Sequence, residues 1–183
     1  YCRIVNDRHF QRIKYLFDDA VEKGAVVVYG GIFDEKDRYV SPTILDNVND
    51  LMKLMQEEIF GPVLPIMSYN DIEEVLTYIN SKQRPLALYI NSKRNDQVNH
   101  ILSNTSAGGT VINDSLMHYG HTELPFGGVN NSGIGKSGGK WGFLEFSNQR
   151  AVLKQKFGNN SFIYPPYTSK VDRLVRFLLK YVT

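Results

Sequence analysis

Apolar residues recur at every third or fourth position near the start of the chain, which predicts an amphipathic helix over residues 7–23. The residues on its apolar face are Phe10, Ile13, Leu16, Phe17 and Ala20. Asn6 or Asp7 can cap the start of this helix, and Gly24 can end it. We therefore expect the chain to open with a helix that packs one face against a core.

Beyond this helix, short apolar runs alternate with helix-like segments. Strands are expected over residues 26–29, 39–45, 63–67, 86–90 and 110–113, and helices over residues 70–81 and 96–102. The valine run at 26–29 is expected to be buried, and Pro42 places its segment at an edge or a bulge. Alternation of this kind predicts an α/β fold: a mostly parallel sheet with helices on both faces.

The C-terminal part, residues 148–183, has a different pattern. Residues 151–156 alternate as in a strand, residues 164–167 are a rigid Tyr-Pro-Pro-Tyr connector, and Thr168 or Ser169 can cap a last amphipathic helix. Its apolar stripe consists of Val171, Leu174, Val175, Leu178, Leu179 and Val182, with basic residues largely on the other side. Such a helix can lie on a membrane surface. Because no hydrophobic tail follows it in this sequence, we expect docking against protein or a partner subunit instead.

The composition is that of an ordinary soluble globular protein, with 183 residues, 42% hydrophobic and 22% charged. A formal net charge of +2 with scattered basic residues gives no support for nucleic-acid binding. The single cysteine, Cys2, excludes an internal disulfide and a cysteine-based zinc cluster and is compatible with a reducing, cytoplasmic setting. No apolar run approaches the roughly 18 residues of a spanning helix. The chain begins at Tyr1, so we expect a piece of a longer protein.

The candidate chemistry begins with the run Glu57-Glu58-Ile59-Phe60-Gly61-Pro62-Val63. A carboxylate can accept hydrogen bonds from both hydroxyls of a ribose, and charge-assisted bonds of this kind are strong. An aromatic ring two positions later could pack against a nicotinamide. The alternative is a surface acid pair with Phe60 in the core.

Residues 118–142 are rich in glycine and lack periodicity, as in a functional loop. Within them, residues 133–138 match G-x-G-x-x-G, but no hydrophobic strand precedes the glycines and no acid follows at the required interval. Gly135-Lys136-Ser137 imitates the end of a P-loop, whose first glycine is replaced by Asn130. We therefore interpret this segment as a loop that needs positive φ angles and close backbone approach.

Taken together, these motifs resemble the C-terminal part of an NAD(P)-dependent aldehyde dehydrogenase. The resemblance rests on residues 57–63, on residues 124–129 followed by Asn131-Ser132-Gly133, and on the order of the segments over residues 1–157. Residues 85–89 and 1–6 are most similar to the class 3, fatty-aldehyde-like branch. The resemblance implies that residues 1–147 are the C-terminal portion of the catalytic domain. It also implies that residues 148–183 hold an oligomerisation strand, a linker and the last helix.

The resemblance implies roles for four residues. Glu58 holds the ribose hydroxyls of the nicotinamide half of NAD or NADP, and Phe60 contacts the nicotinamide. Phe126 approaches the substrate channel, with His118 nearby. Asn113 is as well suited to capping a turn as to catalysis. His118 and His121 could suggest a metal site, but without a third ligand we expect loop hydrogen bonds and no metal.

Three positions depart from the family pattern. Asn130 replaces a glycine, but asparagine tolerates left-handed conformations, so the turn can survive. Gly138 stands where class 3 members often carry histidine, and Cys2 stands at a usual glycine.

In the resembled family, the nucleophilic cysteine, the general-base glutamate and the dinucleotide-binding domain lie upstream of this region. We therefore expect part of a homodimeric enzyme that oxidises aldehydes, with medium- or long-chain and aromatic aldehydes as candidates, and no catalytic residue in this chain. The alternative is a non-catalytic α/β module for subunit interaction or nucleotide binding.

Overall fold

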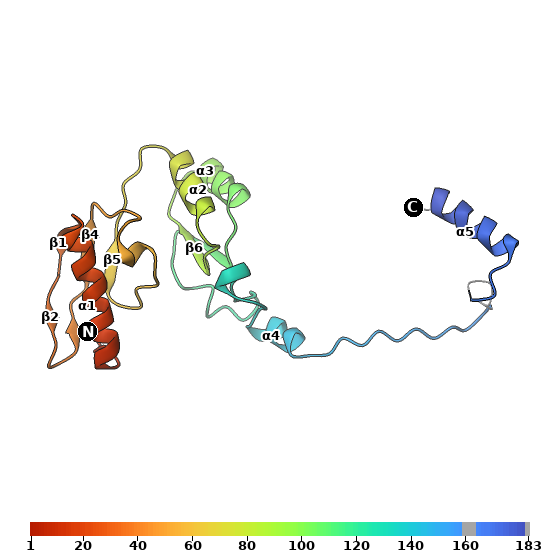
Figure 1. The fold of residues 1–183 in the computed structure, drawn as a ribbon, viewed down its shortest axis with the longest axis horizontal. Helices are drawn as coiled ribbons and strands as arrows, with labels where there is room; N and C mark the ends of the chain where they lie inside the picture. The colour runs from red at the N-terminus through yellow and green to blue at the C-terminus, as the bar shows by residue number, and fades with distance from the viewer. Residues whose placement is uncertain (159–163, 182–183) are drawn as a thin grey trace.

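The computed structural model describes residues 1–158 and 164–181 (Figure 1). The chain forms an N-terminal part up to about residue 66, a second part that ends with α4 (Gly139–Glu145), and an extended segment that leads to α5 (Ser169–Tyr181). In Figure 1, α5 lies well away from both packed parts. Val182, expected in its apolar stripe, lies outside the described residues.

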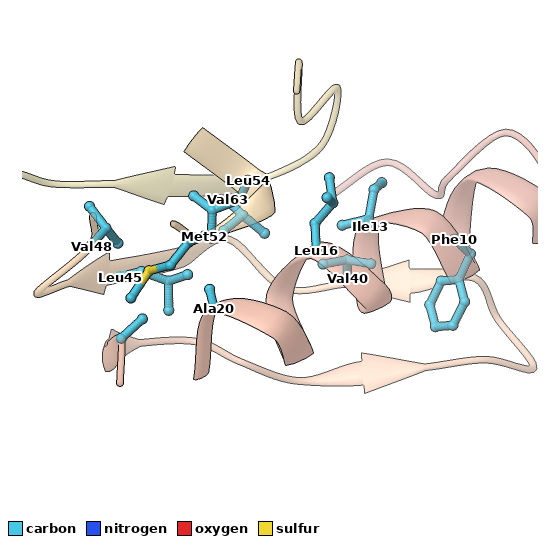
Figure 2. Packing of buried hydrophobic residues seen from close by; sticks show 11 residues of the cluster. Phe10, Ile13, Leu16, Ala20, Val40, Leu45, Val48, Met52, Leu54 and Val63 are labelled. Carbon is cyan, nitrogen blue, oxygen red and sulfur yellow. The ribbon is translucent and has the colours of Figure 1, made fainter. Parts of the chain in front are cut away.

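The N-terminal helix α1 (Asp7–Glu22) confirms the helix that the apolar periodicity predicts over residues 7–23. Asn6 caps it by accepting a hydrogen bond from the backbone N–H of His9 at 2.9 Å. Just beyond the C-cap residue Lys23, Gly24 has a φ of 98°, which suits a glycine after a helix end. Buried side chains of α1 face those of the adjoining strands and of η1 (Lys53–Met55) in Figure 2. The buried residues of this core are Phe10, Ile13, Leu16, Ala20, Ala25, Val40, Leu45, Val48, Met52, Leu54 and Val63.

Beside α1 is a mixed three-stranded sheet with the order β1 (Val26–Tyr29), β4 (Thr43–Asp46) and β5 (Val63–Pro65). Strands β1 and β4 are antiparallel, whereas β4 and β5 are parallel. The expectation of a mostly parallel sheet is wrong. The chain between β1 and β4 contains no helix; it forms the short antiparallel pair β2 (Phe33–Asp34) and β3 (Tyr39–Val40). Without a crossover helix, β4 returns in the opposite direction to β1.

The valine run of β1 is also not buried as expected, because all four of its residues are exposed. The helix α1 and the 3-10 helix η1 contribute to the core beside this sheet, but the exposure of all four β1 residues shows that helices do not cover both faces of this strand. The expectation of helices on both faces is therefore wrong for this part.

The second part follows the predicted order more closely. It contains α2 (Ile72–Ser81), β6 (Ala87–Ile90), α3 (Asn95–Asn104) and β7 (Gly109–Ile112). Asp71 caps α2 by accepting from the N–H of Glu73. Strands β6 and β7 are parallel, with Ala87 opposite Gly109, as a crossover through a helix requires. A small core of Leu76, Ile90, Val98 and Ile101 lies between the helices and the strands.

The expected strand at residues 151–156 is not present. These residues carry no strand ladder, and no element of the described chain lies beside them to accept one. The last helix does form as α5, and its apolar residues are largely exposed, including Leu174, Phe177 and Leu178. Across residues 1–158 and 164–181, no helix has the length and apolar character needed to cross a membrane.

Candidate functional site

Glu58 and Phe60 lie on the short loop between η1 and β5, residues 56–62. Ile59 between them packs against the N-terminal core, so that its two neighbours are left at the surface. The Phe60 side chain is 78% exposed, which rules out the alternative that placed it in the core. The Glu58 side chain is exposed and makes no hydrogen bond or ion pair to any residue that the structure describes.

The backbone of this loop is held by Arg12 of α1. The Arg12 guanidinium donates from Nη1 to the Glu58 carbonyl at 2.9 Å and from Nη2 to the Ile59 carbonyl. Its Nη1 also lies 3.8 Å from a carboxylate oxygen of Glu57. The next residue, Phe60, has a φ of 49°, in the left-handed region that bulky side chains rarely adopt.

The loop also approaches α1 closely at Gly61. A Cβ added there would lie 2.7 Å from Cδ1 of the buried Ile13, so no larger residue fits without a shift. Phe60 borders a pocket that it shares with Arg3, Ile4, Val5 and His9. Arg3 is itself fixed by Asp37, and this bond holds the pKa of the Asp37 carboxyl below its usual value.

The residues present fit the nicotinamide half of a dinucleotide. The unpartnered carboxylate of Glu58 can accept from two ribose hydroxyls, and the exposed ring of Phe60 offers a flat apolar face. Both groups lie on a loop whose backbone is fixed by helix α1 rather than by the side chains that would meet a ligand.

The glycine-rich segment forms a second structured loop. Phe126 and Ser137 pair through two backbone hydrogen bonds of 2.9 and 2.7 Å, and Ser132 turns the chain between them as part of η2 (Asn130–Ser132). A Cβ on Gly128 would lie 2.1 Å from the Ser132 carbonyl oxygen. Asn130 has a φ of 54°, and Gly135 one of 79°. The expectations of positive φ angles and close backbone approach, including left-handed Asn130, are confirmed.

Lys136 occupies the centre of this loop. Its ammonium group donates to the carbonyl oxygens of Gly127 at 2.6 Å, Gly128 at 3.1 Å and Gly108 at 3.2 Å. It thereby ties the glycine-rich loop to the residue just before β7. The lysine that resembles a P-loop lysine is used here to satisfy backbone carbonyls.

Phe126 and His118 are brought together as expected, with ring centroids 5.3 Å apart. Tyr119 packs edge-on against Phe126, and Tyr89 of β6 packs edge-on against His118. Phe126 is half-buried and borders a pocket with residues of the glycine-rich loop and α4. His118, in contrast, is only 8% exposed, and neither ring nitrogen has a hydrogen-bond partner among the described residues, so the expectation of loop hydrogen bonds is wrong for this histidine. It lies behind Phe126 rather than at an open surface.

The remaining polar candidates have structural contacts. Asn113, with a φ of 58°, accepts a hydrogen bond from the Ser92 N–H at 2.8 Å and so joins the ends of β6 and β7. His121 accepts from the Glu123 N–H, as expected for a loop histidine. Within the part of the chain that the structure describes, no group of three potential metal ligands is present.

The two sets of site residues lie in different parts of the chain. Glu58 and Phe60 belong to the N-terminal part, and His118 and Phe126 to the second part. No hydrogen bond, ion pair or ring contact joins the two sets among the described residues. The hydrophobic pattern alone assigns no role to Arg12 or Lys136. A signal existed for Arg12, which stands one helical turn before the buried Leu16 and so borders the apolar stripe.

Comparison with known proteins gives the class of this chain. Residues 3–152 match the model of the aldehyde dehydrogenase family. The chain belongs to that family. Its resemblance to class 3 is supported by aldehyde dehydrogenase family 3 member A2 of Rattus norvegicus. The two are 47% identical in an alignment of 184 positions that covers 98% of this chain and 37% of the relative.

A second relative is the dimeric NADP-preferring aldehyde dehydrogenase of Rattus norvegicus, 43% identical over 94% of this chain and 38% of the relative. Among solved structures, that of Staphylococcus aureus AldH in a substrate-bound state superposes with a TM-score of 0.81. The match is 38% identical and covers 97% of this chain and 38% of that one. The chain thus spans somewhat more than a third of the length of these proteins.

Proposed function

We propose that this chain supplies one wall of the active site of an NAD(P)-dependent aldehyde dehydrogenase, the wall that holds the nicotinamide half of the cofactor. The observation that carries the proposal is the pair Glu58 and Phe60. A carboxylate without protein partners stands beside an exposed aromatic ring on a fixed loop, in a chain of the aldehyde dehydrogenase family.

Each of the four candidate residues has a part in this proposal. Glu58 accepts hydrogen bonds from the ribose hydroxyls, and Phe60 packs against the nicotinamide ring. Phe126 presents an apolar surface to the substrate channel. His118 supports the Phe126 ring from behind, because the two rings are in contact and His118 is buried. The bound cofactor would supply the hydride acceptor for aldehyde oxidation.

The reaction also needs a nucleophilic thiolate and a general base. The only cysteine of this chain, Cys2, is exposed near the N-terminus. We therefore propose that the 183-residue chain has no dehydrogenase turnover by itself. The nucleophile, the base and the phosphate-binding groups belong to polypeptide upstream of the matched region.

The test begins with the coding sequence upstream of Tyr1. It is translated, and the extended polypeptide, meaning this chain with the sequence encoded ahead of it, is expressed beside the 183-residue chain. We expect the extended polypeptide to form NADH or NADPH from medium- or long-chain or aromatic aldehydes, and the shorter chain to form none. Turnover by the 183-residue chain alone would contradict the proposal that the nucleophile and the general base lie outside this chain.

A second candidate function is a non-catalytic α/β module for subunit interaction or nucleotide binding. The observation in its favour is that Cys2 is the only cysteine in this sequence. A start codon directly before Tyr1, with no further coding sequence ahead of it, would favour this alternative.

Further features of the proposed enzyme follow from the same likeness. We propose a homodimer, because a similar protein is named as dimeric and because residues 151–156 are extended with exposed Val152 and Leu153. We also propose a cytoplasmic location, with which a single cysteine is compatible. Residues 1–147 would then belong to the catalytic domain, and residues 148–183 to subunit association. For α5 we favour docking against protein over a membrane surface.

A further inference from the structure

We propose that Arg12 is a positioning residue for the cofactor: its guanidinium clamps the backbone just before Phe60 and so sets the positions of Glu58 and Phe60. The inference rests on the proposed function of this loop. It adds a role for helix α1, which makes no hydrogen bond, ion pair or ring contact with the side chains of Glu58 or Phe60 among the described residues.

The first step concerns the peptide planes. Arg12 donates to two successive carbonyls, those of Glu58 and Ile59. The Ile59 carbonyl belongs to the same rigid peptide plane as the Phe60 nitrogen. Fixing this plane limits the rotation about φ of Phe60, which is held at 49°. An aromatic residue keeps such a conformation only when its surroundings determine it.

The second step concerns the two neighbouring acids. The Arg12 guanidinium lies 3.8 Å from the Glu57 carboxylate, whereas the Glu58 carboxylate has no partner among the described residues. Arg12 therefore engages the first acid and the backbone of the second. This leaves the Glu58 side chain with all of its hydrogen-bonding capacity for a ligand.

The third step concerns the choice of side chain. A guanidinium presents several N–H groups in a rigid planar fork, so it can serve two carbonyls and an acid together. A lysine ammonium is a compact charge on a flexible stem, and it would hold one carbonyl well and the other poorly. The Arg12 side chain is largely shielded, with 29% of its surface exposed, which strengthens these bonds relative to ones in open water.

The experiment compares Arg12→Met and Arg12→Lys with the unsubstituted extended polypeptide in binding to NAD(P) and to ADP by calorimetry. ADP lacks the nicotinamide and its ribose, so it reports on the rest of the cofactor site. We expect Arg12→Met to weaken NAD(P) binding by about tenfold or more, since a charged hydrogen bond contributes roughly that factor, while ADP affinity is unchanged. The NAD(P) affinity of Arg12→Lys should lie between those of Arg12→Met and of the unsubstituted polypeptide. The matched control is Arg8→Met, because Arg8 is exposed on the same helix and its side chain makes no hydrogen bond or ion pair with any described residue.

A second measurement needs no cofactor. Amide hydrogen exchange of the 183-residue chain should be faster in Arg12→Met, and unchanged in Arg8→Met, at Glu57 and Thr43, whose N–H groups donate to Lys53 and Pro62 at the two ends of this loop. Unaltered NAD(P) binding by Arg12→Met overturns the inference and leaves the proposed function standing. Equal losses of NAD(P) and ADP affinity also overturn it, since they would show a general structural effect. If the unsubstituted extended polypeptide binds neither NAD nor NADP, the proposed function and this inference fall together.

Discussion

The hydroxyl of Tyr78 on α2 donates a hydrogen bond of 2.7 Å to the carboxylate of Asp50, a residue of the N-terminal part. The other carboxylate oxygen of Asp50 lies 2.7 Å from Nζ of Lys82, at the C-terminal end of the same helix. These two contacts tie the N-terminal part to the second part. They matter for the candidate site, because Glu58 and Phe60 lie on one part and His118 and Phe126 on the other.

The Asp50 contact should depend on pH in a defined direction. Hydrogen bonds from Lys82 and Tyr78 lower the pKa of the Asp50 carboxyl in the folded chain. Its contribution to folding stability is therefore fully present at pH values above the ordinary aspartate pKa of about 3.9, and it is lost as the pH falls below that value. Bonding to Asp50 raises the pKa of Lys82, so that contribution is lost only when the pH rises above about 10.4. Asp50→Asn should reduce the loss of folding stability on acidification, which is the acid limb of the stability profile. The free energy of unfolding is measured from neutral pH down to pH values below the pKa of free aspartate.

The control for this prediction is Glu22→Gln, because Glu22 is an exposed acid on α1 whose side chain makes no hydrogen bond or ion pair within residues 1–158 and 164–181. It should leave the acid limb as it is. An Asp50→Asn profile with the same acid limb as the unsubstituted chain would show that the contact does not contribute. Because these groups are exposed, the difference should also shrink in high salt.

Lys136→Met should destabilise the glycine-rich loop. The substitution keeps most of the side-chain volume and removes the ammonium group that serves the carbonyls of Gly108, Gly127 and Gly128. Loss of hydrogen bonds to a charged donor should lower the free energy of unfolding by about 1.5–3 kcal/mol. Denaturant unfolding measures this change. The control is Lys140→Met, because Lys140 is exposed and its side chain has no hydrogen bond or ion pair in the part of the chain that the structure describes. An equal effect of the two substitutions would contradict the role given to Lys136.

Gly128→Ala should be harmful through crowding alone. The added Cβ would meet the Ser132 carbonyl oxygen at 2.1 Å, and the backbone on both sides is fixed by the pairing of Phe126 with Ser137. Overpacking of this kind costs about 1–3 kcal/mol. The matched change is Gly120→Ala, where nothing lies within 4 Å of the added atom. Thermal unfolding of the two variants should show a lower midpoint for the first only.

Local signals in the sequence predicted most of the helices. The cap at Asn6 and the stop near Gly24 act within a few residues, so they can be recognised without knowing the fold. The helices α1, α2 and α3 appear near their expected bounds for the same reason. The direction of β4 could not be predicted in this way, because it depends on whether a helix or a hairpin precedes it.

Burial was less predictable than secondary structure. A run of valines indicates a strand, but it does not say what covers each face, and β1 is exposed in this chain. The surface positions of Glu58 and Phe60 agree with the motif, whereas the clamp by Arg12 joins residues separated by 46 and 47 positions. The helical spacing can place Arg12 beside the apolar stripe, but it cannot identify the distant carbonyl groups to which Arg12 donates.

The sharpest test of the cofactor site compares two adjacent acids. Glu57→Gln and Glu58→Gln remove the same charge from neighbouring positions, but Glu57 lies beside Arg12 and Glu58 is free of partners in the described chain. In the extended polypeptide, Glu58→Gln should raise the KM for NAD(P) by about tenfold, because charge-assisted bonds to the ribose become neutral ones. Glu57→Gln should have a smaller effect, since both carbonyl bonds of Arg12 remain. The KM for the aldehyde should change in neither variant. Steady-state kinetics with each substrate varied separately measures these KM values. A larger increase in the KM for NAD(P) from Glu57→Gln than from Glu58→Gln would show that Glu58 is not the acid that holds the ribose.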